Sequence, residues 1–255
     1  MNERALTLMT VNEVYAKTIL SKSKVFDYSV NPYVGCEHGC TYCYARFMKR
    51  YSGHREEWGD FVDAKVNAPG LLRVELKKKT RGRVWMSGTC DPYQPLEKKY
   101  ELTKKCLEVL LEHSWPVTVQ TKSSLVIRDV DLLRKIRDVE VGVTVTTADD
   151  DVRKVFEPNL PSISERVETL MKLRRAGIRT FAMIAPLLPK AEGLPALLRN
   201  RTDYVLIDRM NYHYADWVYR KFKLEYALTD GFFASKKKEL VSAFEEERMP
   251  CQLLF

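Results

Sequence analysis

The sequence predicts an α/β protein whose parallel strands form an open, partial barrel. Short runs rich in β-branched residues alternate with amphipathic helical stretches. This order is typical of parallel strands joined by right-handed crossovers. Six strand–helix units fill about 180 residues, whereas a closed eightfold barrel needs roughly 250. The predicted fold is therefore a partial (β/α)6 barrel of the TIM type.

The six predicted strands are short and rich in residues that favour the extended conformation. They are Val30–Val34, Val84–Thr89, Val117–Thr121, Val141–Thr147, Thr180–Leu188 and Tyr204–Met210. In parallel α/β folds the chemistry lies at the carboxyl ends of the strands. The residues found at or just after these ends are Cys36, Cys90, Asp91, Lys122, Thr146 and Pro186.

Helical periodicity fills the connections between these strands. The expected helices are Glu97–Glu112, Asp129–Ile136 and Ser162–Ala176. The first places apolar side chains on one face, namely Leu102, Cys106, Val109 and Leu110. Ser162 and Glu165 have the spacing of a capping box, and Gly177 is suited to end the same helix. The chain beyond Tyr212 is expected to be helical and to cover the core.

Length and composition indicate one domain over 1–255, with a core of about 18–211 and a helical extension over 212–255. Of the 255 residues, 45% are hydrophobic and 11% aromatic, enough for a packed core. No run of eighteen apolar residues occurs, which predicts no membrane span. The first residues lack the apolar segment of a secretory signal, so we expect a cytoplasmic protein.

The charge balance is basic, with 42 Lys and Arg residues against 34 Asp and Glu residues and a net charge of +8. Basic runs lie at 77–83 and 236–238. Neutralising phosphates releases counterions, so DNA or RNA is a candidate partner. A solvated surface on a charge-rich protein would give the same composition.

Three of the six cysteines crowd into eight residues, with the spacing C-x3-C-x2-C at Cys36, Cys40 and Cys43. Such clustering in a reducing compartment indicates metal ligation or redox chemistry. Three thiolates can hold a cube of iron and sulfide and leave one iron open, because such clusters normally bind four thiolate ligands. Gly35 and Gly39 let the backbone turn tightly around it.

A zinc site is the alternative, because His38 or His54 could complete a Cys3His set. His38 lies only two residues from both Cys36 and Cys40, which is awkward for tetrahedral closure. Tyr42, directly before the last cysteine, suits a planar adenine better than zinc.

The motif C-x3-C-x-aromatic-C resembles that of radical S-adenosylmethionine (SAM) enzymes. Four segments are similar to the spore photoproduct lyase-like branch: NPYVGCEHGCTYCYARF (31–47), TCDPYQPLE (89–97), TKSSLVIRDVDLL (121–133) and Glu157-Pro158. The resemblance covers about residues 18–190. It implies a [4Fe–4S] cluster whose open iron binds SAM, and an external electron donor such as ferredoxin or flavodoxin. Cleavage of SAM would then give a 5′-deoxyadenosyl radical that takes hydrogen from a substrate.

The resemblance also assigns SAM-binding roles. Lys122 would form an ion pair with the methionyl carboxylate of SAM. The alternative is an ordinary, solvated lysine at the end of a strand. Asp91 resembles an acidic residue that orients SAM or substrate; otherwise it caps a turn. Arg166 resembles an arginine that lies near SAM in the family. The alternative is an arginine that is only solvated. Thr144 and Thr146, alternating on one strand face, could bind SAM through their hydroxyls, or reflect β-propensity alone.

Cys90 is the candidate catalytic residue, because photoproduct lyases use a cysteine in this region to return a hydrogen atom to the product radical. A buried, inert thiol is the alternative. Tyr93 could relay hydrogen atoms or stack on a base. The same roles are open to three further residues: Tyr212, His213 and Tyr214. The alternative is that these are ordinary core residues, as aromatic side chains often are.

Three functions remain open on the sequence. The first is a radical SAM enzyme that repairs or modifies a nucleic-acid base in a photoproduct lyase-like way. The second is a radical SAM enzyme acting on a peptide, a protein or a small molecule. The third is a non-enzymatic, zinc-bound module that binds nucleic acid.

Overall fold

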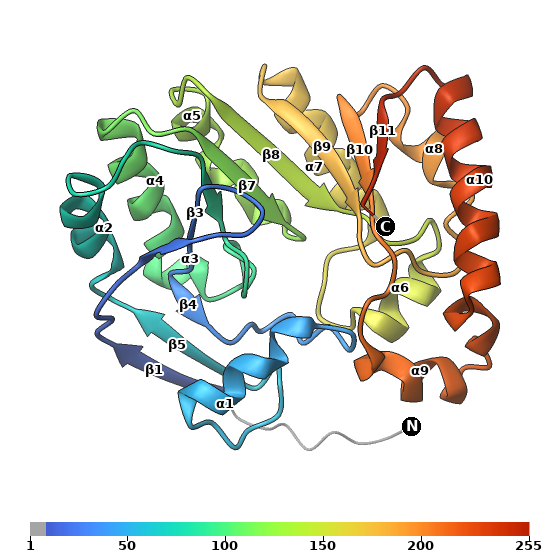
Figure 1. Cartoon of the computed structure of the whole chain (residues 1–255), viewed down its shortest axis with the longest axis horizontal. Helices are drawn as coiled ribbons and strands as arrows, with labels where there is room; N and C mark the ends of the chain where they lie inside the picture. The colour runs from blue at the N-terminus through green and yellow to red at the C-terminus, as the bar shows by residue number, and fades with distance from the viewer. Residues whose placement is uncertain (1–8, 255) are drawn as a thin grey trace.

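One large and mostly parallel sheet organises the chain (Figure 1). The computed structural model describes residues 9–254. Across the sheet the order is β11 (Cys251–Leu253), β10 (Tyr204–Ile207), β9 (Arg179–Ile184), β8 (Val139–Thr144), β7 (Val117–Thr121), β6 (Val84–Met86), β3 (Tyr28–Val30) and β2 (Leu20–Lys22). Among the described strands of this sheet, only β2 and β3 pair in the antiparallel direction. The predicted α/β partial barrel is confirmed.

A second, small sheet carries the start of the chain. It is made of β1 (Thr10–Val14), β5 (Phe61–Lys65) and β4 (Tyr33–Val34). The prediction of one strand over Val30–Val34 is therefore wrong, because β3 ends at Val30 and β4 begins at Tyr33 in the other sheet. Pro32 separates the two strands, and proline has no N–H to donate to a ladder.

The side chain of Asn31 shortens the second predicted strand. Its Oδ1 accepts hydrogen bonds from the backbone N–H groups of Gly88 (2.9 Å) and Thr89 (2.8 Å) and from the hydroxyl of Ser87 (2.8 Å). The two backbone N–H groups are then unavailable to a neighbouring strand. The strand predicted over Val84–Thr89 consequently ends at Met86, and the next residues turn toward Asn31.

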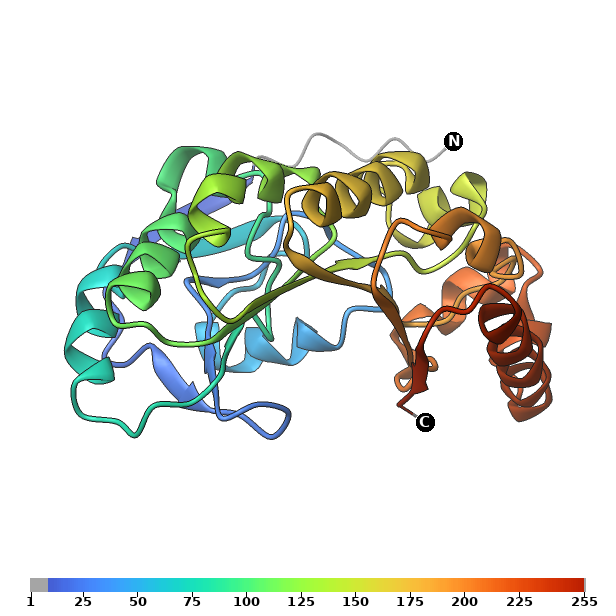
Figure 2. The same cartoon turned by 90° about the horizontal axis from the view of Figure 1, so that it is seen from above.

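Helices pack on the sheet and close its edges. They are α1 (Lys49–Ser52), α2 (Ala68–Leu76), α3 (Glu97–Tyr100), α4 (Leu102–Glu112), α5 (Val130–Leu133), α6 (Asp150–Phe156), α7 (Ile163–Arg175), α8 (Leu194–Leu198), α9 (Asp216–Lys221) and α10 (Asp230–Glu246). Four 3₁₀ segments accompany them: Tyr44–Met48, Ser124–Asp129, His213–Ala215 and Glu225–Leu228. Figure 2 shows α4, α5 and α7 in one layer on a single face of the sheet. The main apolar core lies between this layer and the strands.

The helix predicted over Glu97–Glu112 is divided at Glu101, whose φ is 51°. The division has a local cause. The Glu97 carboxylate accepts hydrogen bonds from the backbone N–H groups of Thr103 (3.0 Å) and Lys104 (3.1 Å), which would otherwise lack partners at the start of α4. The predicted apolar face is confirmed as buried: Leu102, Cys106, Val109 and Leu110.

α7 begins and ends where predicted, but only half of the capping box forms, because the Glu165 carboxylate accepts a hydrogen bond from the Ser124 hydroxyl instead. The hydroxyl of Ser162 accepts a hydrogen bond from the N–H of Glu165 at 3.2 Å. Gly177 has a φ of 80°, and the next N–H, of Ile178, bonds to the carbonyl of Leu173. This is the Schellman arrangement, in which glycine avoids the penalty of a left-handed conformation.

The end of the chain corrects one expectation. The predicted extension over 212–255 contains α9 and α10, but its last described part is the strand β11, which pairs with β10 in register Val205↔Cys251. Pro250 cannot donate a helical hydrogen bond, and its carbonyl instead accepts one from Val205. Within residues 9–254, no helix is long and apolar enough to cross a membrane.

Gly142 provides a test of the packing between strands. A Cβ added at Gly142 in β8 would lie 2.2 Å from the ring of Phe181, which is itself stacked on Tyr204. Overpacking of this kind costs about 1–3 kcal/mol. We expect Gly142→Ala to lower the free energy of unfolding by that amount in urea titrations. Gly70→Ala, in open space on α2, should raise it by about 0.5–1 kcal/mol. Equal effects of both substitutions would contradict the described contact.

Candidate functional site

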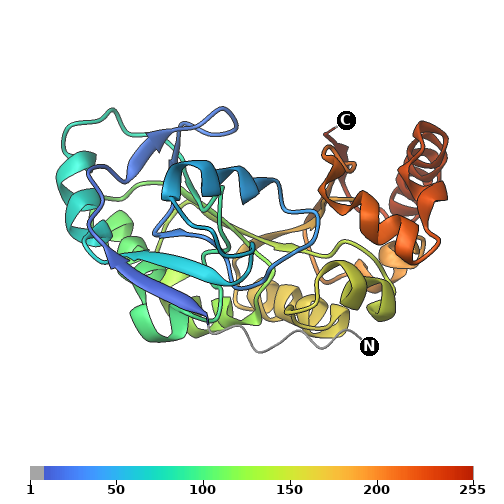
Figure 3. The ribbon, with the colours of Figure 1, turned by 90° about the horizontal axis from the view of Figure 1, so that it is seen from below.

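A cavity of about 110 Å³ lies at the carboxyl ends of β6, β7 and β8. Its walls carry most of the residues predicted to do chemistry: Cys36, Cys40, Cys43, Cys90, Asp91, Lys122 and Thr144. Figure 3 views the molecule from below, with β1, β5 and α1 on one side and α9 and α10 on the other. Because these residues line one cavity, the strand ends bring together side chains that are up to 108 positions apart in sequence, from Cys36 to Thr144.

The cysteine segment turns tightly, as its glycines predict. Gly35 has a φ of 85° and Gly39 a φ of 57°. A Cβ at Gly35 would lie 2.3 Å from the carbonyl oxygen of Phe61, so this position excludes any other residue. Hydrogen bonds from Gly39 N to Cys36 O (3.2 Å) and from Cys43 N to Cys40 O (3.1 Å) set the two turns that present the sulfurs.

Distant parts of the chain hold this segment on both sides. After β6, the side-chain oxygen of Gln94 accepts a hydrogen bond from the N–H of Glu37 at 3.0 Å. At the last residue of α6, the carbonyl of Phe156 accepts one from the N–H of Thr41 at 2.9 Å. After α6, the side-chain amide of Asn159 donates a hydrogen bond to the carbonyl of Glu37 at 3.0 Å. Neither Gln94 nor Asn159 is predicted to hold the cysteine segment, because no local sequence signal marks either residue.

Burial opposes ionisation of the three thiols. It raises the pKa of Cys36 well above the ordinary value, raises that of Cys40 to about 12, and raises that of Cys43. The cation of Lys122 acts in the other direction on Cys40 and Cys43. Because iron binds the thiolate form, assembly of a cluster must release these protons.

The donor set fits an iron–sulfur cluster. Three cysteine sulfurs line one cavity, and thiolate is the preferred ligand of such clusters. Among the described residues, no three His, Cys, Asp or Glu side chains are arranged to hold a single metal ion. Thiolates that bind different irons of a cube do not need to converge on one point.

His38 and His54, the candidate fourth ligands of zinc, have different partners. His38 lines the cavity, with its Nε2 3.4 Å from Asp91 Oδ2. His54 instead pairs with Asp63 at 2.9 Å and stacks on Phe61, with ring centroids 4.0 Å apart.

Asp91 links three segments around the cavity. Its carboxylate accepts hydrogen bonds from the hydroxyl of Thr121 (2.6 Å) and the N–H groups of Lys122 (2.7 Å) and Tyr93 (2.9 Å). Burial alone would raise its pKa, but His38, Thr121 and Lys122 lower it to about 2, against 3.8 for an ordinary aspartate. The stabilisation is present above about pH 4 and is lost as the pH falls toward 2. The predicted turn-capping role is confirmed.

A buried ion pair supports Tyr42 behind the cysteines. Arg166 Nη1 lies 2.7 Å from Glu157 Oε2, and both side chains are 0% exposed. The other oxygen of Glu157 accepts a hydrogen bond from the Tyr42 hydroxyl. Burial would raise the pKa of Glu157, but Arg166, Lys122 and Tyr42 together lower it. The solvated alternative for Arg166 is therefore wrong.

Lys122 and Thr144 present polar groups to the cavity. In the described part of the chain, nothing accepts a hydrogen bond from Lys122 Nζ, which lies 6.0 Å from the ring centroid of Tyr42. The hydroxyl of Thr144 is buried and has no partner among the described groups. Thr146 is also buried with an unpartnered hydroxyl, but it lies beyond the end of β8 and does not line the cavity.

Cys90 and Tyr93 have different surroundings. Cys90 lines the cavity, packs with Cys36 and Cys43, and has its sulfur 2.9 Å from the hydroxyl of Ser87. Burial raises the pKa of Cys90 to about 11, so the thiol keeps its hydrogen at neutral pH. Tyr93 lies in the main core and does not line the cavity, which leaves no contact there for its predicted catalytic role. Tyr44, which the sequence analysis left out, lines the cavity instead.

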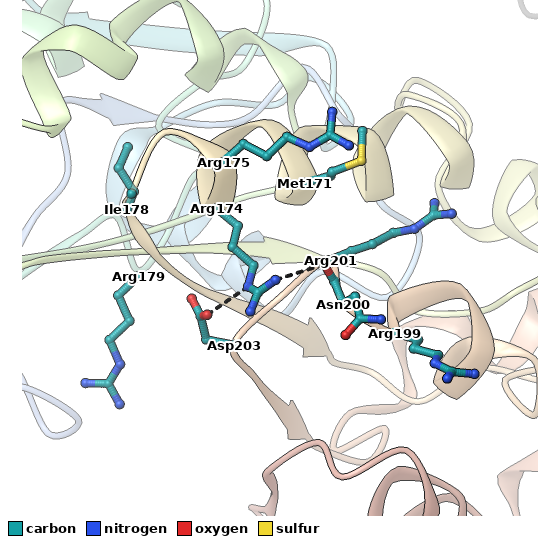
Figure 4. Close-up of a pocket in the computed structure, with 10 residues that line it drawn as sticks. Met171, Arg174, Arg175, Ile178, Arg179, Arg199, Asn200, Arg201 and Asp203 are labelled. Carbon is teal, nitrogen blue, oxygen red and sulfur yellow. Dashed lines mark hydrogen bonds and ion pairs between the residues drawn. The ribbon is translucent and has the colours of Figure 1, made fainter.

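A larger groove of about 810 Å³ lies at the opposite, amino-terminal ends of β9 and β10 (Figure 4). Five arginines line it: Arg174, Arg175, Arg179, Arg199 and Arg201. Three of them already pair with acids, namely Arg174 with Asp203, Arg179 with Glu140 and Arg199 with Glu247. Despite its size, the groove lacks the thiols of the smaller cavity, which is therefore the candidate site.

Comparison with known proteins agrees with the cysteine site. The Radical SAM superfamily model matches residues 30–192, which include the cysteine segment, Cys90, Lys122 and Arg166. The chain belongs to the radical SAM superfamily. This superfamily uses a [4Fe–4S] cluster and SAM, so the protein is an enzyme, and the zinc-bound, non-enzymatic alternative is wrong.

The relatives of this radical SAM protein are diverse. An uncharacterized protein of Methanocaldococcus jannaschii is 35% identical over 69% of this chain and 67% of its own length. A radical SAM Nalpha-GlyT isomerase of Pseudomonas phage M6 is 27% identical over 62% of this chain, but only 32% of its own length.

A spore photoproduct lyase variant with bound AdoMet and dinucleoside spore photoproduct has a similar structure. The TM-score is 0.72 and the identity 13%, over 97% of this chain and 82% of the lyase. At this identity the similarity shows a shared fold. The fold class is thus confirmed, and the predicted likeness to spore photoproduct lyase is confirmed at the level of the fold.

The buried ion pair gives a stability prediction for this radical SAM protein. Removing one member of such a pair leaves an uncompensated buried charge and costs about 3–5 kcal/mol. We expect Glu157→Leu to lower the free energy of unfolding by that amount in anaerobic urea titrations. Combining it with Arg166→Met should recover most of the loss, since no charge is then left alone. A double variant as unstable as the single one would contradict a charge-based role.

Proposed function

We propose that this enzyme repairs or modifies a base in nucleic acid, with SAM held between the cysteine trio and Lys122 and with Cys90 as the hydrogen-atom donor. The observation that carries the proposal is that three cysteines, a free ammonium group and a protonated fourth cysteine line one cavity. When bound, the cluster supplies one electron that cleaves SAM into methionine and a 5′-deoxyadenosyl radical, which takes a hydrogen atom from the substrate.

The residues around the cavity suit the parts of SAM. The Lys122 ammonium can pair the methionyl carboxylate, and the unpartnered Thr144 hydroxyl can bond to a polar atom of the nucleotide. Arg166 acts indirectly, because it holds Glu157 and through it the ring of Tyr42 beneath Lys122. We assign Arg166, Glu157 and Tyr42 as positioning residues. We assign Asp91 the same role, because its carboxylate is fully engaged in the turn.

Cys90 can complete the reaction. A hydrogen atom passing from the Cys90 thiol to the substrate radical forms a C–H bond and breaks the S–H bond. The sulfur is left as a thiyl radical, which one electron and one proton restore to the thiol. An external donor of the ferredoxin or flavodoxin class would supply that electron, as it supplies the one for SAM. Such a donor fits a reducing, cytoplasmic setting.

Two observations favour a nucleic-acid base as the substrate over a peptide or a small molecule. The net charge of +8 attracts a polyanion. The structurally similar lyase is described with a dinucleoside photoproduct bound. A base inside a duplex would have to leave the stack to reach a buried cavity. We propose a single catalytic domain over the whole chain, because β11 at its end pairs with β10 in the main sheet.

Loss of one ligand tests the cluster assignment. After anaerobic reconstitution with iron, sulfide, dithionite and SAM, we expect the wild type to form 5′-deoxyadenosine and Cys40→Ala to form none. Cys251→Ala removes a cysteine at the sheet edge, away from the cavity, and should retain formation. Chromatographic measurement of 5′-deoxyadenosine decides the matter, and formation by Cys40→Ala would refute the assignment.

Solvent deuterium tests the role of Cys90, because thiol hydrogens exchange with water. Reactions in D₂O with total cellular DNA or RNA should give product nucleosides that carry deuterium, detectable by mass spectrometry. Cys90→Ala should cleave SAM but give no such labelled product, whereas Cys106→Ala, in the apolar core, should behave as the wild type. Labelled product from Cys90→Ala would assign the donor elsewhere, and no nucleoside product from the wild type would reject the proposed substrate.

A further inference from the structure

Four exposed aromatic side chains form a row beside the cavity. Tyr44 and Phe47 come from the 3₁₀ segment that follows the cysteines, whereas Tyr212 and Tyr214 follow β10. Their exposed fractions are 39%, 38%, 50% and 38%. We call these four residues the aromatic row.

The rings of the row are nearly parallel. From Phe47 to Tyr44 the ring centroids are 6.5 Å apart with planes at 25°, and from Tyr44 to Tyr212 they are 5.9 Å apart at 20°. From Tyr212 to Tyr214 the values are 6.0 Å and 16°. Two segments about 165 residues apart therefore bring the rings of Tyr44 and Tyr212 within 20° of parallel. Flat, parallel and partly exposed faces suit a series of planar ligands.

Tyr44, the second ring of the row, lies at the rim of the cavity. The Tyr44 hydroxyl donates a hydrogen bond to the carbonyl of Gly88, and both residues line the cavity. Cys90 lies two residues beyond Gly88 on the same wall. A strand whose target base enters the cavity would thus place its neighbouring bases along the row.

Positive charge is interleaved with the first rings. Residues 44–55 contain four Lys and Arg residues and no Asp or Glu: Arg46, Lys49, Arg50 and Arg55. The Arg46 guanidinium lies 5.9 Å from the ring centroid of Tyr214. On the other side, Asp216 is already paired with His213 at 3.1 Å. Cations next to stacking faces are the combination that binds single-stranded nucleic acid, since phosphates and bases are both engaged.

We propose that the aromatic row binds the unpaired bases that flank the target base, so that the enzyme acts on single-stranded or locally unpaired DNA or RNA. This inference rests on the proposed function, since it requires a nucleic-acid substrate. It adds the form of that substrate and the surface that selects it.

Oligonucleotide binding by the reconstituted enzyme tests the row. Fluorescence anisotropy would compare fluorescein-labelled ten-nucleotide oligothymidylate and oligouridylate with a ten-base-pair duplex, over a series of salt concentrations. We expect single strands to bind more tightly than the duplex. Phe47→Ala combined with Tyr212→Ala should weaken single-strand binding roughly tenfold or more at every salt concentration. The slope of log affinity against log salt should not change, because no charge is removed.

Three further variants make the test specific. Tyr15→Ala removes a tyrosine that is 81% exposed and lies outside the row, so it should bind as the wild type does. Phe47→Trp keeps a flat ring and should retain binding, which guards against a mere folding defect. Arg50→Ala should lower the salt slope by about one, as expected for one lost phosphate contact.

The outcomes separate this inference from the proposed function. If the wild type binds none of the oligonucleotides at low salt, the nucleic-acid function fails and the inference fails with it. If single strands bind but the alanine variants bind them equally well, only the aromatic row is refuted. Sedimentation velocity tests a third outcome. If the wild type is a dimer and the alanine variants are monomers, the row joins two copies of this chain. That result would also refute the inference.

Discussion

One buried carboxylate, that of Asp91, joins the segments from which the site is built. It holds the end of β7 through Thr121 and Lys122, fixes the turn after β6 through Tyr93, and lies 3.4 Å from His38 in the cysteine segment. These contacts keep it ionised in a place where burial favours the neutral acid. Lys122 can face the cysteines because its own backbone is tied to this carboxylate.

A second buried carboxylate, that of Glu157, connects segments on the other side of the cysteine segment. Glu157 follows α6 and connects Arg166 of α7 with the hydroxyl of Tyr42. The carboxylates of Asp91 and Glu157 are therefore both engaged in contacts that position other residues. Among the described residues, the charged group that still faces the cavity is the Lys122 ammonium. Such a cavity suits a ligand that carries a carboxylate, and the surrounding burial excludes water from reactive species.

How far the sequence predicts this arrangement depends on the range of each interaction. The strand–helix alternation and the C-x3-C-x2-C spacing are local patterns, and they predict the parallel sheet and the grouped cysteines. The rule that carboxyl ends of parallel strands meet at one edge predicts that Lys122 and Cys90 lie near the cysteines, whereas their roles follow from the resemblance to the family. The break between β3 and β4, the contacts of Gln94 and Asn159 with the cysteine segment, and the strand β11 all depend on partners distant in sequence. The aromatic row is of the same kind, because only the fold brings Tyr44 next to Tyr212.

The account depends on a cluster that is held by three thiolates and has one iron left for SAM. Electron paramagnetic resonance of the reduced, reconstituted enzyme tests this most directly. With SAM labelled with ¹⁵N in its amino group and ¹⁷O in its carboxylate, the account predicts hyperfine couplings of both labels to the cluster. A cluster signal that SAM does not alter, or that shows a histidine nitrogen on the fourth iron, would contradict it.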